Sequence, residues 1–236
     1  MYLQGVLALP FFMKNILDHL SEFVLPRRLQ LFDQVLDQRT RYITVALEDI
    51  YQSQNASAVL RTCECLGIQD IHIIEDRNKY KLNPDVVMGS TKWLSLHRYN
   101  KSSSPSLEAI QQLKAKGYRI VATTLHDNDI ELPDLKLPSG RIALFFGTEL
   151  TGLSQTVLDN ADEYVKIPMH GFTESFNISV SAAIILHHLS SELRQSDLKW
   201  QLTPQEKNEL KLSWLRQSIK KVDLIEEEFF SKNMEK

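Results

Sequence analysis

Short apolar runs alternate with longer amphipathic segments through the middle of the chain. Runs rich in β-branched and aromatic residues predict strands at residues 41–48, 71–75, 119–124, 142–146 and 163–167, with a sixth at 93–99. Helical spacing of apolar positions occurs at 55–66, 106–116, 154–160 and 177–193, and Gly67 and Gly117 stand where two of these helices would end. Strands that alternate with helices predict an α/β fold with a parallel sheet and helices on both of its faces.

Helical patterns also flank this region. Residues 14–36 precede the first strand and residues 203–230 follow the last helix, with Thr203 and Pro204 placed as an N-cap and a first-turn proline. We therefore expect an N-terminal helical extension at 1–40, a central domain at 41–196 and a C-terminal helical extension at 197–236. Residues 1–12 are apolar but lack the basic residues and cleavage site of a signal peptide, and Met1 and Met13 both fit as the native start.

Composition narrows the class of protein. The 236 residues are 43% hydrophobic and 24% charged, which is typical of a globular chain with an apolar core. Cys63 and Cys65 are too few and too close together for a disulfide framework or a zinc site, so we expect no metal and a reducing, cytoplasmic location. No apolar run is long enough to cross a bilayer, and no membrane partner is expected.

The net charge of −3 weighs against a nucleic-acid partner, but the distribution of basic residues weighs for one. Two interpretations of these basic residues stay open: they belong to ordinary solvated surfaces, or they bind the phosphates of a nucleic acid. They fall into three groups: Arg27, Arg28, Arg39 and Arg41 near the N-terminus; Lys79, Lys81, Lys92, Arg98 and Lys101 in the middle; and Lys207, Lys211, Arg216, Lys220 and Lys221 near the C-terminus.

A glycine-rich phosphate loop is absent from the sequence. The eight glycines never form G-x-G-x-x-G or G-x-x-x-x-G-K, which disfavours a Rossmann dehydrogenase or a P-loop enzyme. The first strand is followed instead by a polar connection, Tyr-Gln-Ser-Gln-Asn, that ends at Asn55.

The helix predicted after that connection carries an arginine, Arg61, close to its apolar face. A guanidinium beside a buried stripe needs an anionic or carbonyl partner, because an unpaired buried charge is costly. Two interpretations stay open: a structural ion pair with Glu48 or Glu149, and a functional arginine. The stripe expected to be buried is Ala58, Thr62, Cys65 and Leu66.

Two further stretches combine a predicted strand with an irregular loop. In Ile-Ala-Leu-Phe-Phe-Gly-Thr-Glu-Leu-Thr-Gly-Leu-Ser, at 142–154, Gly147 allows close backbone approach and Glu149 supplies a carboxylate at the ligand-binding edge of the sheet. In Ile-Pro-Met-His-Gly-Phe-Thr-Glu-Ser-Phe-Asn, at 167–177, a strand ends at a proline, and Ser175 or Asn177 caps the next helix. Such loops offer backbone groups to a nucleoside-like ligand.

In this order and spacing the three stretches resemble the motifs of the SpoU/TrmH methyltransferases. The first, Asn-Ala-Ser-Ala-Val-Leu-Arg-Thr-Cys-Glu-Cys-Leu-Gly, has the asparagine, the arginine six residues on and the closing glycine of that family. The second is Phe-Gly-Thr-Glu-Leu-Thr-Gly-Leu-Ser, at 146–154. The third, at 167–183, has the isoleucine-proline-methionine core of the family, and one departure from the family pattern is Phe176, where leucine is usual. The resemblance covers roughly residues 42–193.

This resemblance implies a SPOUT fold with a C-terminal trefoil knot, S-adenosylmethionine as cofactor, RNA as substrate and a homodimer with its active sites at the subunit interface. It implies that Arg61 is catalytic, that Asn55 places the substrate, and that Glu149, Ser175 and Asn177 complete the polar site. The residues implied for cofactor binding are Thr123, Leu125, Gly147, Gly152, Ile167, Met169 and Phe176.

The implied reaction is methylation of a ribose 2′-hydroxyl, with Arg61 either as the base or as a group that orients the hydroxyl and stabilises negative charge. Enzymes of this family that act on ribosomal RNA often carry a sizeable N-terminal domain, whereas the short helical extensions here resemble the tRNA enzymes that modify the D-loop guanosine at conventional position 18. We expect Arg27, Arg28, Arg39 and Arg41 to contact the phosphates of that tRNA. The alternatives are ribosomal RNA as substrate, methylation of a base nitrogen, and a non-catalytic RNA-binding relative.

Overall fold

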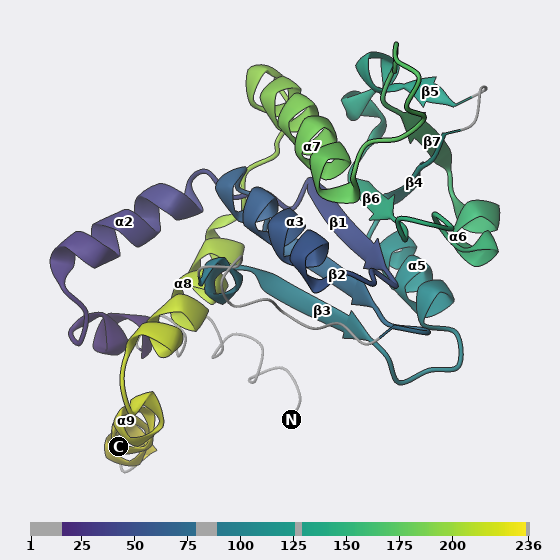
Figure 1. The fold of residues 1–236 in the computed structure, drawn as a ribbon. Coiled ribbons are helices and arrows are strands. Elements are labelled where there is room, and N and C mark those ends of the chain that lie inside the picture. The colour runs from purple at the N-terminus through teal and green to yellow at the C-terminus, as the bar shows by residue number, and fades with distance from the viewer. Residues whose placement is uncertain (1–15, 79–88, 126–128, 235–236) are drawn as a thin grey trace. The chain divides into compact units, whose positions relative to one another are not determined.

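The computed structural model describes residues 16–78, 89–125 and 129–234. The chain divides into two compact units: a sheet unit, Thr40–Trp200, and a helical unit formed by Met1–Arg39 together with Gln201–Lys236 (Figure 1). Residues 1–12, which belong to the native chain only if it starts at Met1 and not at Met13, lie outside the described residues, as do Lys79 and Lys81.

The sheet unit is built on seven parallel strands in the order β3-β2-β1-β6-β4-β7-β5. The predicted parallel α/β architecture is therefore confirmed, and each of the six predicted strands is present. The two-residue strand β5 was not predicted, because so short a run carries no periodicity. The strands are β1 (Ile43–Glu48), β2 (Asp70–Ile74), β3 (Ser95–Tyr99), β4 (Arg119–Thr123), β5 (Ile130–Glu131), β6 (Ile142–Phe146) and β7 (Glu163–Lys166).

Helices cover both faces of this sheet (Figure 1). The helices α3 (Ser53–Cys65) and α7 (Ile178–Gln195) pack on one face, with alternate strand residues such as Val45 and Leu144 beneath them. The helices α5 (Pro105–Ala115) and α6 (Gln155–Asn160) cover the other face, over Ala46 and Phe145. Both faces of the central strands are thus buried, which explains why these strands are apolar throughout.

Two short connections at the edges of the sheet depend on backbone conformations that the sequence indicated. Gly67 and Gly117 follow α3 and α5 with φ of +77° and +80°, the left-handed conformation that ends a helix.

The strand predicted at 93–99 is shorter than expected. Ser90–Trp93 forms a 3₁₀ turn, and only Ser95–Tyr99 pairs with β2. Three-residue 3₁₀ turns, Leu132–Asp134 and Leu137–Ser139, lie between β5 and β6.

The burial pattern predicted for α3 is wrong. The helix buries a different stripe, and Arg61 and Cys65 are exposed while Ala58, Thr62 and Leu66 are only partly buried. The reason is that α3 packs against both the sheet and α7, which selects a face that its weak apolar periodicity does not mark. The buried residues are Asn55, Ala56, Ser57, Val59, Leu60 and Cys63.

The helical unit joins segments from both ends of the chain. Residues 16–21 are helical, and α2 (Pro26–Leu36) starts after an extended Leu25, since a residue that precedes proline avoids the helical conformation. The C-terminal segment forms α8 (Pro204–Ser218) and α9 (Val222–Met234). Thr203 and Glu206 form a reciprocal capping box at the start of α8.

Packing within the helical unit centres on Trp214 of α8. Its ring lies edge-on to Phe32 at 5.5 Å between centroids, and the guanidinium of Arg39 sits 5.6 Å from the ring centre. Arg39 is 1% exposed. The ion pairs Lys207–Asp37 and Lys211–Asp33, each at 2.6 Å, lie at the surface of the same helices.

Among the described helices, none combines the length and the apolar character needed to cross a membrane.

Candidate active site

A cavity of about 690 Å³ opens at the edge of the sheet where the strands end. Because the sheet is parallel, the loops after β4, β6 and β7 meet there and form most of the wall. The first turn of α3 and the start of α7 close the remaining side through Gln52, Asn55 and Ile178. The size and the mixed polar and apolar lining are those of a site for a small organic molecule.

Every residue that the resemblance implied for cofactor binding lines this cavity. They come from segments up to 53 positions apart, and the parallel topology brings their strand ends to one edge. These residues are Thr123, Leu125, Gly147, Gly152, Ile167, Met169 and Phe176.

The loop after β6 has two positions at which the backbone favours glycine. Thr148 and Gly152 exchange backbone hydrogen bonds of 2.9 and 3.1 Å, which folds the loop back on itself. Gly152 has φ of +68°, and a Cβ on Gly147 would overlap the backbone of Gly152 and Leu153. The hydroxyls of Thr148 and Thr151 lie 2.7 Å apart and tie the tip of the loop. Glu149 is thus presented by a tightly constrained turn.

Asn55 connects the three motifs at the rim of the cavity. Its Nδ2 donates to Oε1 of Glu149 at 2.5 Å, and its Oδ1 accepts from Nδ2 of Asn177 at 3.2 Å. Asn55 is buried, whereas Glu149 and Asn177 are exposed toward solvent. Buried amides require partners, so this network fixes the orientation of Asn55 and places a carboxylate and two amides side by side.

The start of α7 is set by the same asparagine that takes part in this network. Oδ1 of Asn177 accepts the backbone N–H of Ser179 at 2.8 Å, which makes Asn177 the N-cap; the sequence had left Ser175 and Asn177 as alternatives. Ser175 lies two residues earlier and lines the cavity. One side chain therefore ends the irregular loop and joins the polar site.

Arg61 does not line the cavity in this chain. It lies six residues after Asn55 on α3 and is exposed, so burial does not force a charged partner on it. The carboxylates proposed as its structural partners bond elsewhere: Glu149 accepts from Asn55, and the buried Glu48 accepts from the backbone and hydroxyl of Ser154 and from the hydroxyl of Ser106.

Two residues of the site were not predicted from the sequence. Gln52 lines the cavity, and its Oε1 accepts from Nδ2 of Asn55 at 3.2 Å. Its place in the polar connection after the first strand was the available signal. Glu48 fixes Ser154, the N-cap of α6 immediately after the Gly147 loop, through a 2.8 Å bond to its backbone N–H.

The four arginines expected to contact RNA occupy different environments. Arg27 and Arg28 are exposed on α2. Arg39 is buried over Trp214, and Arg41 pairs with Asp70 at 3.0 Å. The burial of Arg39 and the ion pair of Arg41 with Asp70 keep these two guanidinium groups away from an RNA phosphate, so we propose only Arg27 and Arg28 of the four for RNA binding.

One cluster of titratable groups with shifted pKa values, which includes His72 and Tyr99, lies away from the cavity on β2 and β3. Burial, together with the neighbouring charge of His97, lowers the pKa of His72 to about 3. Nδ1 of His72 lies 2.9 Å from the hydroxyl of Tyr99, whose pKa burial raises to about 12. In the described part of the chain, no group of three or more His, Cys, Asp or Glu side chains is arranged to hold a metal ion.

The fold and the site define an α/β protein that binds a small ligand in a cavity formed by irregular loops at the carboxyl edge of a parallel sheet. The model of the SpoU rRNA Methylase family matches residues 42–187. The chain belongs to this family. The segment matched includes all three motifs and most of the sheet unit.

Curated relatives match nearly the whole chain. A tRNA (guanosine(18)-2'-O)-methyltransferase of Borreliella burgdorferi is 48% identical over 207 residues, which cover 88% of this chain and 93% of the relative. The enzyme of the same name from Thermus thermophilus is 32% identical over 194 residues, covering 80% and 96%.

Solved structures share the fold. The TrmH/SpoU tRNA modifying enzyme of A. aeolicus aligns with a TM-score of 0.73 at 25% identity, over 83% of this chain and 98% of that one. The SpoU methyltransferase AviRb of Streptomyces viridochromogenes, in complex with the cofactor AdoMet, aligns with a TM-score of 0.57 at 23% identity, over 69% of this chain and 62% of that one.

Proposed function

We propose that this chain transfers a methyl group from S-adenosylmethionine to the ribose 2′-hydroxyl of a tRNA guanosine, at conventional position 18. The observation that carries the proposal is the meeting of Asn55, Glu149 and Asn177, one from each motif, at the rim of the cavity. A non-catalytic relative has no need to keep this set, and the asparagine–arginine first motif favours ribose over base nitrogen.

The cavity fits S-adenosylmethionine in size and in chemistry. Leu125, Ile167, Met169 and Phe176 supply apolar contacts and loop backbone groups, and Gly147 brings the chain close where a side chain would block approach. When bound, this cofactor supplies a methyl group that is already electrophilic.

The polar rim suits a ribose hydroxyl. Asn55, held by Glu149 and Asn177, is a fixed hydrogen-bonding group that orients the sugar, since its own donors and acceptors are already aligned by its partners. Arg61 then orients the hydroxyl and stabilises the negative charge that develops on its oxygen. We prefer this role to that of a base, because a guanidinium holds its proton tightly.

We further propose a homodimer, with the active site completed at its interface. Two observations support it. Arg61 is exposed and outside the cavity of its own chain, and large apolar side chains are exposed around the cavity and on the first turn of α7. Exposed apolar clusters of this kind mark interaction surfaces. They are Leu125, Leu150, Phe172, Phe176 and Val180.

The trefoil knot is part of the same proposal. The segments that would form it are the loops after β6 and β7, and both reach the cavity through Gly147 and Ile167. A knotted chain of this kind is an exception to the rule against threaded loops, and it would hold the irregular cofactor loops rigidly.

Transfer RNA is favoured over ribosomal RNA because the curated relatives that match most of the chain carry that activity in their names. Mass spectrometry of tRNA and ribosomal RNA from a deletion strain tests it. We expect the 2′-O-methyl group of guanosine 18 to be missing from tRNA. A ribose methyl missing from ribosomal RNA, with tRNA unchanged, would refute the tRNA assignment.

Calorimetry tests the cofactor independently. We expect S-adenosylmethionine and its demethylated product to bind and NAD not to bind. An absence of S-adenosylmethionine binding, with or without tRNA, would contradict the central proposal.

A further inference from the structure

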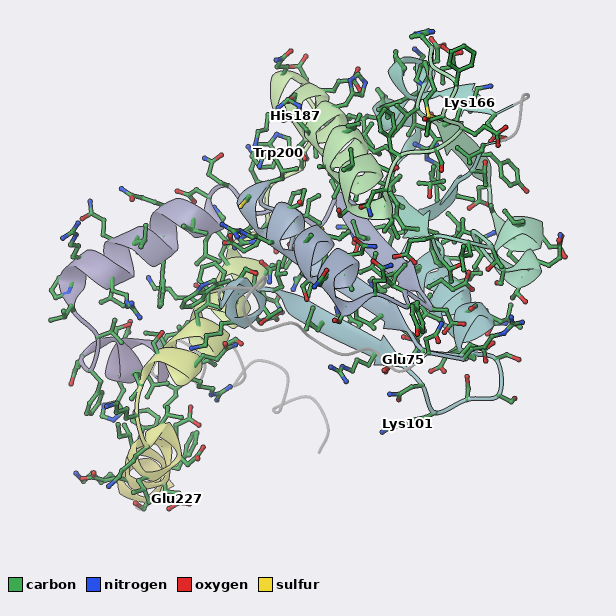
Figure 2. All side chains as sticks on the ribbon, viewed as in Figure 1. Glu75, Lys101, Lys166, His187, Trp200 and Glu227 are labelled. Atoms are coloured by element: carbon green, nitrogen blue, oxygen red, sulfur yellow. The ribbon has the colours of Figure 1, made fainter. Side chains whose placement is uncertain are left out.

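The carboxyl edge of the sheet extends beyond the cavity. The cavity is lined mainly by the loops after β6, β4 and β7, with Gln52 and Asn55 from the connection after β1, while the loops after β1, β2 and β3 continue along the same edge beyond it. These three loops present Tyr51, Arg77 and Lys101, all with exposed side chains. Figure 2 labels Glu75 and Lys101, which follow β2 and β3 at this edge.

Tyr51 is the feature of this edge that needs explanation. Its side chain is 78% exposed, although nothing in a polar connection requires an aromatic residue. The next residue, Gln52, lines the cavity and accepts a hydrogen bond from Asn55. Tyr51 therefore directly precedes a residue of the cavity wall, close in the chain to the polar network that we assign to the reacting ribose.

The loops of this edge are joined to one another. Asp49 has φ of +53°, and its carboxylate accepts the backbone N–H groups of Asp76 and Arg77 at 2.8 and 2.9 Å, while Nδ2 of Asn78 donates to the Asp49 carbonyl at 2.9 Å. These bonds tie the loop after β1 to the loop after β2. The Asp49 carboxylate is thus used for hydrogen bonds within the loops.

A second bond ties the next pair of loops. Nδ2 of Asn100 donates to Oε2 of Glu75 at 2.7 Å, which joins the loop after β3 to the loop after β2. Tyr51, Arg77 and Lys101 are thus carried by a connected set of loops across two inter-strand spacings, about 10 Å in all. Asp76 is also exposed at this edge, so the charge is mixed and the aromatic ring is the main recognition element.

We propose that this edge binds the RNA strand next to the reacting nucleotide, with Tyr51 stacked on a neighbouring base and with Arg77 and Lys101 on flanking phosphates. The proposal rests on the proposed function. Exposed aromatic rings on a fixed platform bind unstacked bases of any sequence, and basic side chains beside them follow the backbone. Sequence preference would come from the other parts of the protein.

The experiment measures the affinity of the full-length protein for a tRNA transcript by fluorescence anisotropy, with S-adenosylhomocysteine present. Tyr51→Leu keeps an apolar side chain but removes the ring, and Tyr51→Trp keeps a ring. We expect Tyr51→Leu to weaken tRNA binding by about fivefold or more and Tyr51→Trp to bind like the wild type. The affinity for the cofactor product should stay unchanged in both.

The phosphate contacts have a separate readout and a matched control. The double variant Arg77→Ala/Lys101→Ala should make the dependence of log affinity on log salt shallower by about 1.4, as expected for two contacts to a single strand. Lys116 is exposed at the opposite edge of the sheet, between α5 and β4, and Lys116→Ala should leave the slope unchanged.

Wild-type affinity for tRNA in Tyr51→Leu would overturn the stacking role, and an unchanged salt slope in the double variant would overturn the phosphate contacts. If either variant instead dissociates an oligomer in sedimentation, the edge is a protein interface and the proposal is wrong. Failure of the proposed function is seen separately, as wild-type protein that transfers no methyl group to tRNA.

Discussion

Asn55 and Glu149 are 94 positions apart in the chain, yet the side-chain amide of one donates to the carboxylate of the other at 2.5 Å. The bond joins the first turn of α3 to the loop after β6, because β1 and β6 are neighbours in the parallel sheet. Asn177 extends the network to the start of α7. This contact turns three separate stretches of sequence into one site.

Glu149 should be needed for transfer more than for folding, because it is exposed and bonds the substrate-facing amide. We expect Glu149→Ala to lower kcat/KM for tRNA by at least tenfold, since Asn55 loses its acceptor and its orientation. Glu149→Gln keeps a hydrogen-bond acceptor, so its kcat/KM should lie between those of Glu149→Ala and the wild type. Steady-state kinetics and a thermal melt distinguish this result from simple destabilisation.

Asn177 has two roles that different substitutions separate. Asn177→Ala removes the cap of α7 and should lower the free energy of unfolding by about 1 kcal/mol. Asn177→Ser keeps a capping oxygen but cannot donate to Asn55. We expect it to keep most of the stability, measured by urea unfolding, and to lose methyl transfer. Full activity in Asn177→Ser would show that the contact with Asn55 is not used.

Arg61→Ala should abolish nearly all methyl transfer while the fold and the cofactor affinity change little, because the side chain is exposed and outside the cavity. Arg61→Lys should restore little activity, since a point charge lacks the planar, forked donors. Circular dichroism is the control. A loss of folding rather than of activity would return Arg61 to a structural role.

Gly147→Ala tests the loop after β6. A methyl group there would meet the backbone of Gly152 and Leu153, and backbone cannot move aside cheaply. We expect a loss of about 1–3 kcal/mol in the free energy of unfolding together with weaker S-adenosylmethionine binding. Gly171→Ala is the matched control, because a Cβ there meets no atom closer than 4.0 Å. Equal behaviour of the two variants would contradict the argument.

The lowered pKa of His72 leads to a prediction of how the free energy of unfolding depends on pH. Its folded pKa of about 3 lies below its ordinary value of 6.5, so protons bind the unfolded chain more readily. The stabilising contribution is therefore complete above pH 6.5 and is lost as the pH falls from 6.5 toward 3. Between pH 7 and pH 5 this amounts to about 2 kcal/mol. In urea unfolding, His72→Gln should show a correspondingly smaller difference between the two pH values.

The sequence by itself determined the elements and their alternation. The apolar run at 142–146 marks β6 because burial on both faces of a sheet leaves a continuous apolar segment. The helical spacing at 177–193 marks α7 because burial on one face of a helix leaves a local period. Gly67 and Gly117 marked helix ends for an equally local reason, the left-handed backbone that glycine adopts. The motif residues were likewise visible in the sequence.

Only the tertiary structure decided which of these residues meet. The strand order places β6 between β1 and β4, and no local pattern encodes that order, because the central strands β1, β2 and β6 are all buried on both faces. The same packing chose the buried face of α3, left Arg61 exposed, and buried Arg39 against Trp214. Burial and partnership are properties of contacts between distant segments, so a residue type alone cannot report them.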